Sequence, residues 1–428
     1  MSARASERAR GLALAVALAC ALGSSVVGCD EPSGLVLRVR RDAPATGRGA
    51  RLIAYGGGVP RSAADLDAIA TAIETGGALV FDGMVLDLGY ARALTRAPVD
   101  APEADAMAAR LARSPLSQMT ESYVLVEVRP GDMDWRDEAS FAPAVENVRR
   151  AAASARAAGA RGLFLDTQAY EGQLFSLPDV APGASFEDVA LAVRERARAI
   201  MRAVLGELAD PVIVLTLGPG EVWRSVCLDG VALELDRYGL LPSFVDGLGD
   251  EIAAAGRGTV IDGQLGAYPV TQVRALELLH AIGRGADDAE LAARWIPGVP
   301  TYRWPRDPAL ESGEITLPDV FAVRCAPATA ARVRRPMRAG LGLMLDYEQV
   351  AFESDPALFD RNYRTPAELR AVLGAALERA DGLVWLFAAN VDLFARPSTP
   401  LTPLPDAYRD AILQARVVIG DAPDAGAP

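Results

Sequence analysis

The chain contains no lysine: all 43 basic residues among its 428 are arginine, and His280 is the only histidine. Without lysine no side chain can form a Schiff base, which excludes aldolase and transaldolase chemistry. A single histidine excludes a metal centre built from several histidines and argues against a Ser-His-Asp triad. His280 lies in a helix-like pattern and is interpreted as a structural or surface residue. Carboxylates, tyrosines, arginines and asparagines remain for chemistry.

Cysteine is also scarce, with four residues in the whole chain. Cys20 lies inside an apolar run near the N-terminus, and Cys29 follows that run directly. The other two are Cys227 and Cys325. In an oxidising compartment an even pair favours a disulfide, and the alternative is two separate thiols beneath loops.

Residues 1–28 have the pattern of a bacterial secretion signal. Arg4, Arg8 and Arg10 precede the apolar run GLALAVALACALGSSVV. The run is too short and too rich in small residues for a spanning helix, which takes about 20 mostly apolar residues. It ends on VVGC, a lipobox-like sequence in which Cys29 becomes the lipid-bearing first residue. We therefore expect a cell-envelope protein, periplasm-facing or on the outer surface, held to the membrane only by this lipid; an unlipidated cleaved signal is the alternative.

The chain is acidic, with a formal net charge of −13, and loss of three arginines and one glutamate with the signal brings it to −15. Such a surface repels phosphate groups, so no nucleic-acid partner is expected.

Eight apolar runs of strand length alternate with segments of helical period. This repeat predicts an α/β fold, a (β/α)8 TIM barrel forming a single domain over residues 49–418. A tether at 29–48 precedes it and a disordered tail at 419–428 follows. An open doubly wound sheet is the alternative, but no glycine-rich dinucleotide motif supports it. The long excursion at 285–338 precedes the seventh run, and Ser62, Ser185 and Thr365 are expected to cap helices.

Reacting groups of a barrel gather where its strands end, and the ends of these runs are acidic and aromatic. Asp166 and Asp346 are the strongest candidates because each directly follows a run that should be buried, where desolvation raises a carboxyl pKa. Two converging carboxyls suit acid/base or nucleophilic work on sugars, and flat rings stack on pyranose faces. The further catalytic candidates are Glu171 and Glu348. The expected ligand-contacting residues are Tyr55, Asp82, Gln168, Tyr170, Trp223, Asp262, Tyr268 and Trp385.

The sequence resembles a mostly uncharacterised group of secreted bacterial barrel proteins that look like glycoside hydrolases. The resemblance runs from about Arg51 to Phe394 and rests on IAYGGGVP, FDGMVLDL, GLFLDTQAY, YGLLPSFVDG, TVIDGQLGAY and NYRTPAELRAVLGAALERADGLVWLF. The family has Gly-Trp-Asp after its first strand, Asp-x-Glu-x-Tyr after its fourth and Asp-Gly-x-Glu after its sixth. Here Gly56-Gly57-Gly58 replaces the first motif. Asp166, Tyr170 and Asp262 match the others, but Gln168 and Leu265 stand where the family has glutamates.

Two functions follow from this pattern. Either Glu171, Asp346 or Glu348 supplies the missing carboxyl and the protein hydrolyses a carbohydrate, or the barrel binds a glycan without cleaving it. An amide cannot replace a carboxyl in proton transfer, and leucine can neither donate nor accept a proton. The resemblance implies a carbohydrate ligand and no cofactor. A divalent metal held by Asp166 and Asp346 is a weaker alternative, so no metal site is predicted.

Overall fold

The sheet consists of parallel strands in the order β10-β11-β1-β2-β3-β4-β5-β6-β9. The computed structural model describes residues 49–76, 80–128, 133–168, 174–268, 270, 272–295, 300–302, 315–316, 321–346, 351–396 and 399–417. The strands of this sheet are β1 Arg51–Gly56, β2 Gly83–Leu86, β3 Tyr123–Glu127, β4 Gly162–Asp166, β5 Val212–Leu215, β6 Thr259–Asp262, β9 Arg338–Ala339, β10 Leu341–Met344 and β11 Leu383–Ala388.

The sheet closes on itself through β9 and β10, which are consecutive in the chain and separated only by Gly340. β9 pairs with β6, β10 pairs with β11, and β11 pairs with β1, always in parallel. The backbone N–H of Gly340 donates to the carbonyl of Asp262 at 2.7 Å, which continues the contact to β6. β9 and β10 therefore act together as the seventh of eight barrel positions. This confirms the predicted TIM barrel.

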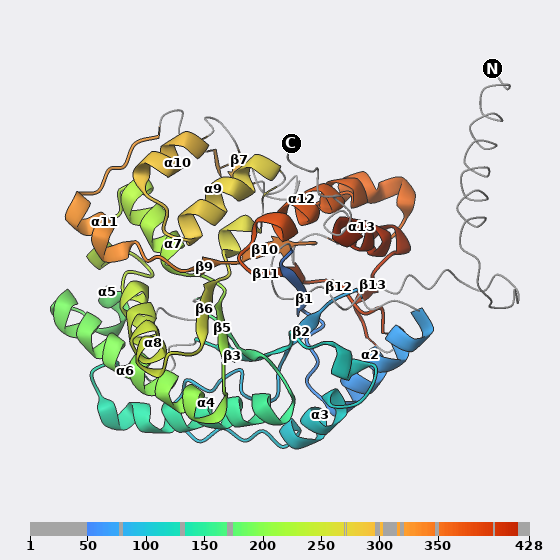
Figure 1. Ribbon diagram of the computed structural model, residues 1–428, viewed down its shortest axis with the longest axis horizontal. Coiled ribbons are helices and arrows are strands. Elements are labelled where there is room, and N and C mark those ends of the chain that lie inside the picture. Colours follow the sequence, from blue (N-terminus) through green and yellow to red (C-terminus); the bar gives the residue numbers. More distant parts are fainter. Residues whose placement is uncertain are drawn as a thin grey trace, which may run out of the picture. The chain divides into compact units, whose positions relative to one another are not determined.

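Helices follow the strands and surround them (Figure 1). The helices that return the chain between strands, with the one that follows β11, are α2 Ala63–Gly76, α3 Ala104–Leu111, α4 Glu138–Ala157, α6 Phe186–Glu207, α8 Leu241–Ala255, α9 Val273–Gly283, α12 Pro366–Arg379 and α13 Asp406–Val417. The shorter elements include α5 Leu177–Val180, α7 Pro219–Trp223, α10 Asp288–Arg294, α11 Pro327–Val333, β7 Pro300–Tyr302, β8 Ile315–Thr316, β12 Val391–Asp392 and β13 Thr402–Pro403. Because α10, β7, β8 and α11 lie between α9 and β9, the predicted excursion before the seventh strand is confirmed.

The three helix starts expected from the sequence have the side-chain bonds of N-caps. The Ser62 hydroxyl accepts from the N–H of Asp65 at 3.2 Å, and that of Ser185 accepts from Asp188 at 3.4 Å. Thr365 and Glu368 form a reciprocal capping box at the start of α12. Such caps satisfy donors that the first helical turn leaves unpaired.

Alternation along each strand divides the buried apolar side chains into two clusters. One fills the barrel and includes Ile53, Leu125, Phe164, Val214 and Trp385. The other lies between the strands and the helices. Within the part of the chain described by the structure, no helix is both long enough and apolar enough to cross a bilayer.

Arg364, just before α12, joins the ends of two strands. Its side chain is fully buried, and its guanidinium donates to the carbonyls of Tyr268 and Val270, each at 2.6 Å, and of Met344. Burial lowers the pKa of Arg364 to about 10. The Tyr408 hydroxyl of α13 donates to the Arg364 carbonyl at 2.6 Å. One buried cation thus fixes the segments after β6 and β10 relative to α12 and α13.

Candidate active site at the carboxyl end of the barrel

Asp166 faces into the barrel at the end of β4. Phe164, two residues earlier, belongs to the interior cluster, and side chains two apart on a strand point to the same side. Asp166 is only 1 % exposed. Since active sites of TIM barrels lie at the ends of the strands, this position is the one in which a carboxylate can meet a ligand.

Asp166 is held by donors from three segments. Its Oδ2 accepts from the Tyr55 hydroxyl of β1 at 2.9 Å. Its Oδ1 accepts from the Thr216 hydroxyl, just after β5, at 3.0 Å and from the backbone N–H of Gln168 at 3.1 Å. An ionised carboxylate suits this environment because it only accepts hydrogen bonds. Gln168, predicted to contact ligand, is half-buried and contributes this backbone donor.

An aromatic cluster lies beside Asp166 inside the barrel. The ring of Tyr55 is 4.7 Å from that of Phe164 and 5.6 Å from that of Trp385, centroid to centroid. The Tyr268 ring is 4.8 Å from Trp385 and 5.3 Å from Phe387. The structure therefore brings the predicted Tyr55, Tyr268 and Trp385 together. Phe164 and Phe387 were not singled out, although alternation with Asp166 and Trp385 indicates their inward direction.

Glycine at position 342 makes room for this cluster. A Cβ atom there would lie 2.5 Å from the ring of Trp385. The indole N–H of Trp385 donates to the carbonyl of Gly263 at 2.8 Å, so the ring has a fixed orientation. Trp385 is fully buried in the third position of β11 and lies within the barrel, below the strand end at which the sequence placed it.

Asp346 closes a loop. It is 2 % exposed, and its two carboxylate oxygens accept from the backbone N–H groups of Ala389 and Asn390, each at 2.6 Å. Burial raises the pKa of Asp346 to about 6, against the lowering effect of these hydrogen bonds. Asp346 thus combines the raised pKa expected of an acid with the backbone contacts of a structural carboxylate.

Asp262 faces the outer layer, contrary to the expectation that it contacts ligand. The neighbouring Ile261 belongs to the interior cluster, so the Asp262 side chain points the other way. Its carboxylate accepts from the backbone N–H groups of Gln264 at 3.0 Å and of Gly220 in α7 at 3.3 Å. Burial raises the pKa of Asp262 to about 6. A Cβ on Gly218 would lie 2.3 Å from this carboxyl carbon, so the neighbouring loop requires glycine.

Asp82 lies at the opposite end of the barrel from the position predicted. It precedes β2, which begins at Gly83, and accepts from the N–H of Leu52 at 2.8 Å. Arg416 of α13 forms an ion pair with it at 2.8 Å. The apolar residues Val80 and Phe81 before it made the predicted run too long, so the start of the strand was taken for its end.

Trp223 also lies away from the mouth. It is 2 % exposed in the layer between strands and helices, and the guanidinium of Arg334 lies 5.3 Å from its ring centroid. The short helix α7 turns its side chain outward. Trp223 therefore packs the outer layer and does not join the aromatic cluster around Tyr55.

Cys227 and Cys325 form a disulfide, with their Cα atoms 4.6 Å apart. Cys227 lies in the segment after β5, and Cys325 lies just before α11. The N–H of Arg324 also donates to the carbonyl of Cys227 at 2.7 Å. The bond joins the excursion before β9 to the segment between β5 and α8.

Several predicted features fall outside the described residues. They are the signal at 1–28 with Cys29, the tether at 29–48, the tail at 419–428, and the candidate site residues Tyr170, Glu171 and Glu348.

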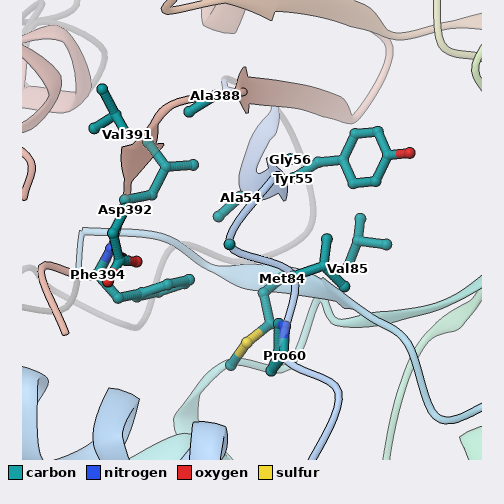
Figure 2. A pocket seen from close by; sticks show the side chains of 13 residues that line it. Ala54, Tyr55, Gly56, Pro60, Met84, Val85, Ala388, Val391, Asp392 and Phe394 are labelled. Atoms are coloured by element: carbon teal, nitrogen blue, oxygen red, sulfur yellow. Dashed lines mark hydrogen bonds between the residues drawn. The ribbon is translucent and has the colours of Figure 1, made fainter. Parts of the chain in front are cut away.

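A small cavity opens beside β1 on the other side of the strand from the aromatic cluster. Val391 and Asp392 line this cavity, and Figure 2 shows the ring of Tyr55 pointing away from both of them. Its volume of about 10 Å³ holds one water-sized group. A sugar ring does not fit, so this cavity is not the ligand site. In the described ranges, no three histidine, cysteine or acidic side chains are grouped to hold a metal ion.

The chain matches no protein-family model and no curated protein. Similar solved structures include a GH18 chitinase from Pseudoalteromonas aurantia, with 9% identity over 86% of this chain and 100% of the other and a TM-score of 0.33. A family 1 β-glucosidase from Thermotoga maritima has 11% identity over 82% and 85%, with a TM-score of 0.32. Morphinone reductase has 12% identity over 84% and 88%, with a TM-score of 0.29. At these low scores, the barrel assignment rests on the strand topology.

Proposed function

We propose that this protein is a cell-envelope lipoprotein whose barrel acts on a carbohydrate by carboxylate acid/base chemistry. The observation that carries the proposal is Asp166, held by Tyr55 and Thr216 at the strand ends beside the aromatic cluster. A fixed carboxylate serves as nucleophile or base at an anomeric carbon, and aromatic side chains favour the apolar faces of sugars. The secretion signal and Cys29 support the location.

Binding without cleavage is the second candidate, and the position of Gln168 favours it. Its backbone N–H contacts Asp166 where the resembling family carries a glutamate. An amide there orients a ligand but transfers no proton. The two candidates share the ligand class and differ in turnover.

The chain from residue 30 onward, which contains every residue described by the structure, is tested on a glycan panel for both hydrolysis and binding. Asp166→Asn keeps the shape of the side chain and removes its charge. For a hydrolase, we expect turnover to fall by a factor on the order of 10²–10⁴ with little change in melting temperature. For a binding protein, we expect affinity to weaken by about 1–3 kcal/mol.

Asp262→Asn is the matched control because Asp262 is equally buried at the same end of the barrel, two strands away, but faces the outer layer. We expect this variant to lower the melting temperature more than it changes turnover or affinity. If the wild type neither cleaves nor binds any glycan, the proposed function is wrong. If Asp166→Asn keeps full activity or affinity, Asp166 is a structural carboxylate.

A further inference from the structure

Glu127 and Asp166 are direct neighbours across two strands. The register of β3 and β4 pairs Glu127 with Asp166, and the N–H of Val128 donates to the Asp166 carbonyl at 2.8 Å. Tyr123 and Leu125 belong to the interior cluster, so alternation turns Glu127 inward as well. Neighbouring strands lie about 4.8 Å apart. The two carboxyl-bearing side chains therefore leave adjacent strand ends on the same side of the sheet.

The two carboxyls differ in their surroundings. Asp166 is 1 % exposed and accepts from the hydroxyls of Tyr55 and Thr216 and from one backbone N–H. Glu127 is only half-buried and its side chain is one methylene longer. Solvent thus reaches the side chain of Glu127, whereas Asp166 is screened from it.

We propose that Glu127 is the acid/base partner of Asp166 and that the protein hydrolyses its glycoside with retention of configuration. This inference rests on the proposed function and assigns a partner other than Asp346, Glu171 or Glu348. A spacing of about 5–5.5 Å between carboxyls is typical of retaining enzymes, and 6.5–9.5 Å of inverting ones. Side chains that leave register-paired positions of adjacent strands on the same side of the sheet can bring their carboxyls within the shorter range.

The reaction proceeds in two steps. An Asp166 oxygen bonds to the anomeric carbon while the bond from that carbon to the leaving oxygen breaks, and this oxygen takes the proton of Glu127. Glu127, now a carboxylate, then takes a proton from water. The water oxygen bonds to the anomeric carbon and the bond to Asp166 breaks, which restores both groups. Two inversions at carbon give net retention.

The test uses a panel of dinitrophenyl and nitrophenyl pyranosides, α and β, with the wild type and Glu127→Gln. Glutamine keeps the size of the side chain. Turnover of nitrophenyl glycosides, whose leaving group needs more acid assistance, is expected to fall by about 10²–10⁴-fold. With dinitrophenyl glycosides, which leave with little assistance, added azide should restore turnover and give a glycosyl azide of retained configuration. A purely structural role for Glu127 gives no such rescue.

Glu121→Gln is the control, since Glu121 precedes the same strand at the opposite end of the barrel. We expect it to leave turnover unchanged. If the wild type is active but Glu127→Gln is equally active, the inference is wrong. It is also wrong if the wild type gives a product of inverted configuration. In both cases the protein is still a hydrolase, as proposed. A wild type that cleaves no glycoside on any panel overturns hydrolysis itself, and the inference with it.

Discussion

At the scale of single residues, three aspartates at strand ends show how surroundings divide one residue type. Asp166 faces inward and accepts from two hydroxyls, Asp346 closes the loop after β11, and Asp262 binds the start of α7. The sequence marks all three equally, as an acid after an apolar run. The partners of each side chain, which lie far away in the sequence, separate the inward-facing Asp166, held by two hydroxyls, from the two aspartates that accept from backbone N–H groups of loops.

The raised pKa of Asp346 predicts a defined pH dependence of stability. Burial raises its pKa from the ordinary 3.8 to about 6, so the folded state binds more protons between these two values. The stabilising contribution is therefore complete below about pH 4 and is lost as the pH rises through about 6. Asp346→Asn removes this titration. We expect the stability difference, wild type minus variant, to fall by roughly 3 kcal/mol from pH 3.5 to 7.

Urea unfolding at several pH values measures this difference. Comparison with the variant cancels the contributions to stability of other carboxylates, such as Asp250, whose pKa is lowered by Arg194. Asp134→Asn serves as a half-buried control: because Arg136 lowers the pKa of Asp134, its stability difference from the wild type is not expected to fall as the pH rises. A pH-independent difference for Asp346→Asn would falsify the assignment.

At the scale of elements, the sequence predicts the strands and main helices well, because apolar runs and capping residues are local signals. Thr365 with Glu368 is an example: their spacing alone marks the start of α12. The β2 run includes apolar residues on both sides of Asp82, so its boundary and the place of Asp82 were wrong. Helix α13 was not predicted, since it follows a segment that pairs with no further barrel strand.

The site was less predictable than the fold. The carboxylate at Asp166 and the ring of Tyr55 could be named from strand ends, but their hydrogen bond joins β1 to β4 and depends on closure of the barrel. The neighbour relation of Glu127 and Asp166 depends on strand register, which no local pattern fixes. Trp223 was misassigned because a short helix, rather than a loop, follows β5.

Arg364 provides a prediction at this scale, because one side chain holds the segments after β6 and β10. Arg364→Met leaves the carbonyls of Tyr268, Val270 and Met344 without this donor. We expect the free energy of unfolding to fall by on the order of 3 kcal/mol, since buried acceptors without a partner are costly. Chemical denaturation measures this effect. Arg361→Met, at an exposed arginine nearby, should change stability little, and equal losses in both variants would argue against the role of Arg364.

At the scale of the whole molecule, the barrel and the proposed anchor are separate features of the chain. Helix α13 contacts both ends of the barrel: Tyr408 donates to Arg364 near the mouth, and Arg416 pairs with Asp82 at the base. The proposed lipid at Cys29 lies before all described residues. Loss of the lipid is therefore expected to change location and leave the barrel intact.

Cys29→Ser tests the anchor in bacterial cells that produce the full chain. We expect the wild type in the membrane fraction and the variant released or incompletely processed, because serine lacks the thiol that receives the lipid. Fractionation with mass measurement of the N-terminus reads both effects. Cys20→Ser, within the proposed signal, is the control and should behave as the wild type. Normal processing and membrane retention of Cys29→Ser would contradict lipidation.

The pairing of β1 with β11 has a consequence for the order in which the molecule forms. The ladder from Arg51 with Leu383 to Gly56 with Ala388 joins the first barrel strand to the last. A ribosome completes β11 only after nearly the whole chain has been synthesised, so the edge of β1 has no partner until then. Open strand edges invite pairing with other chains. If the proposed signal directs export of the unfolded chain, β1 and β11 can pair only after the last strand has crossed the membrane.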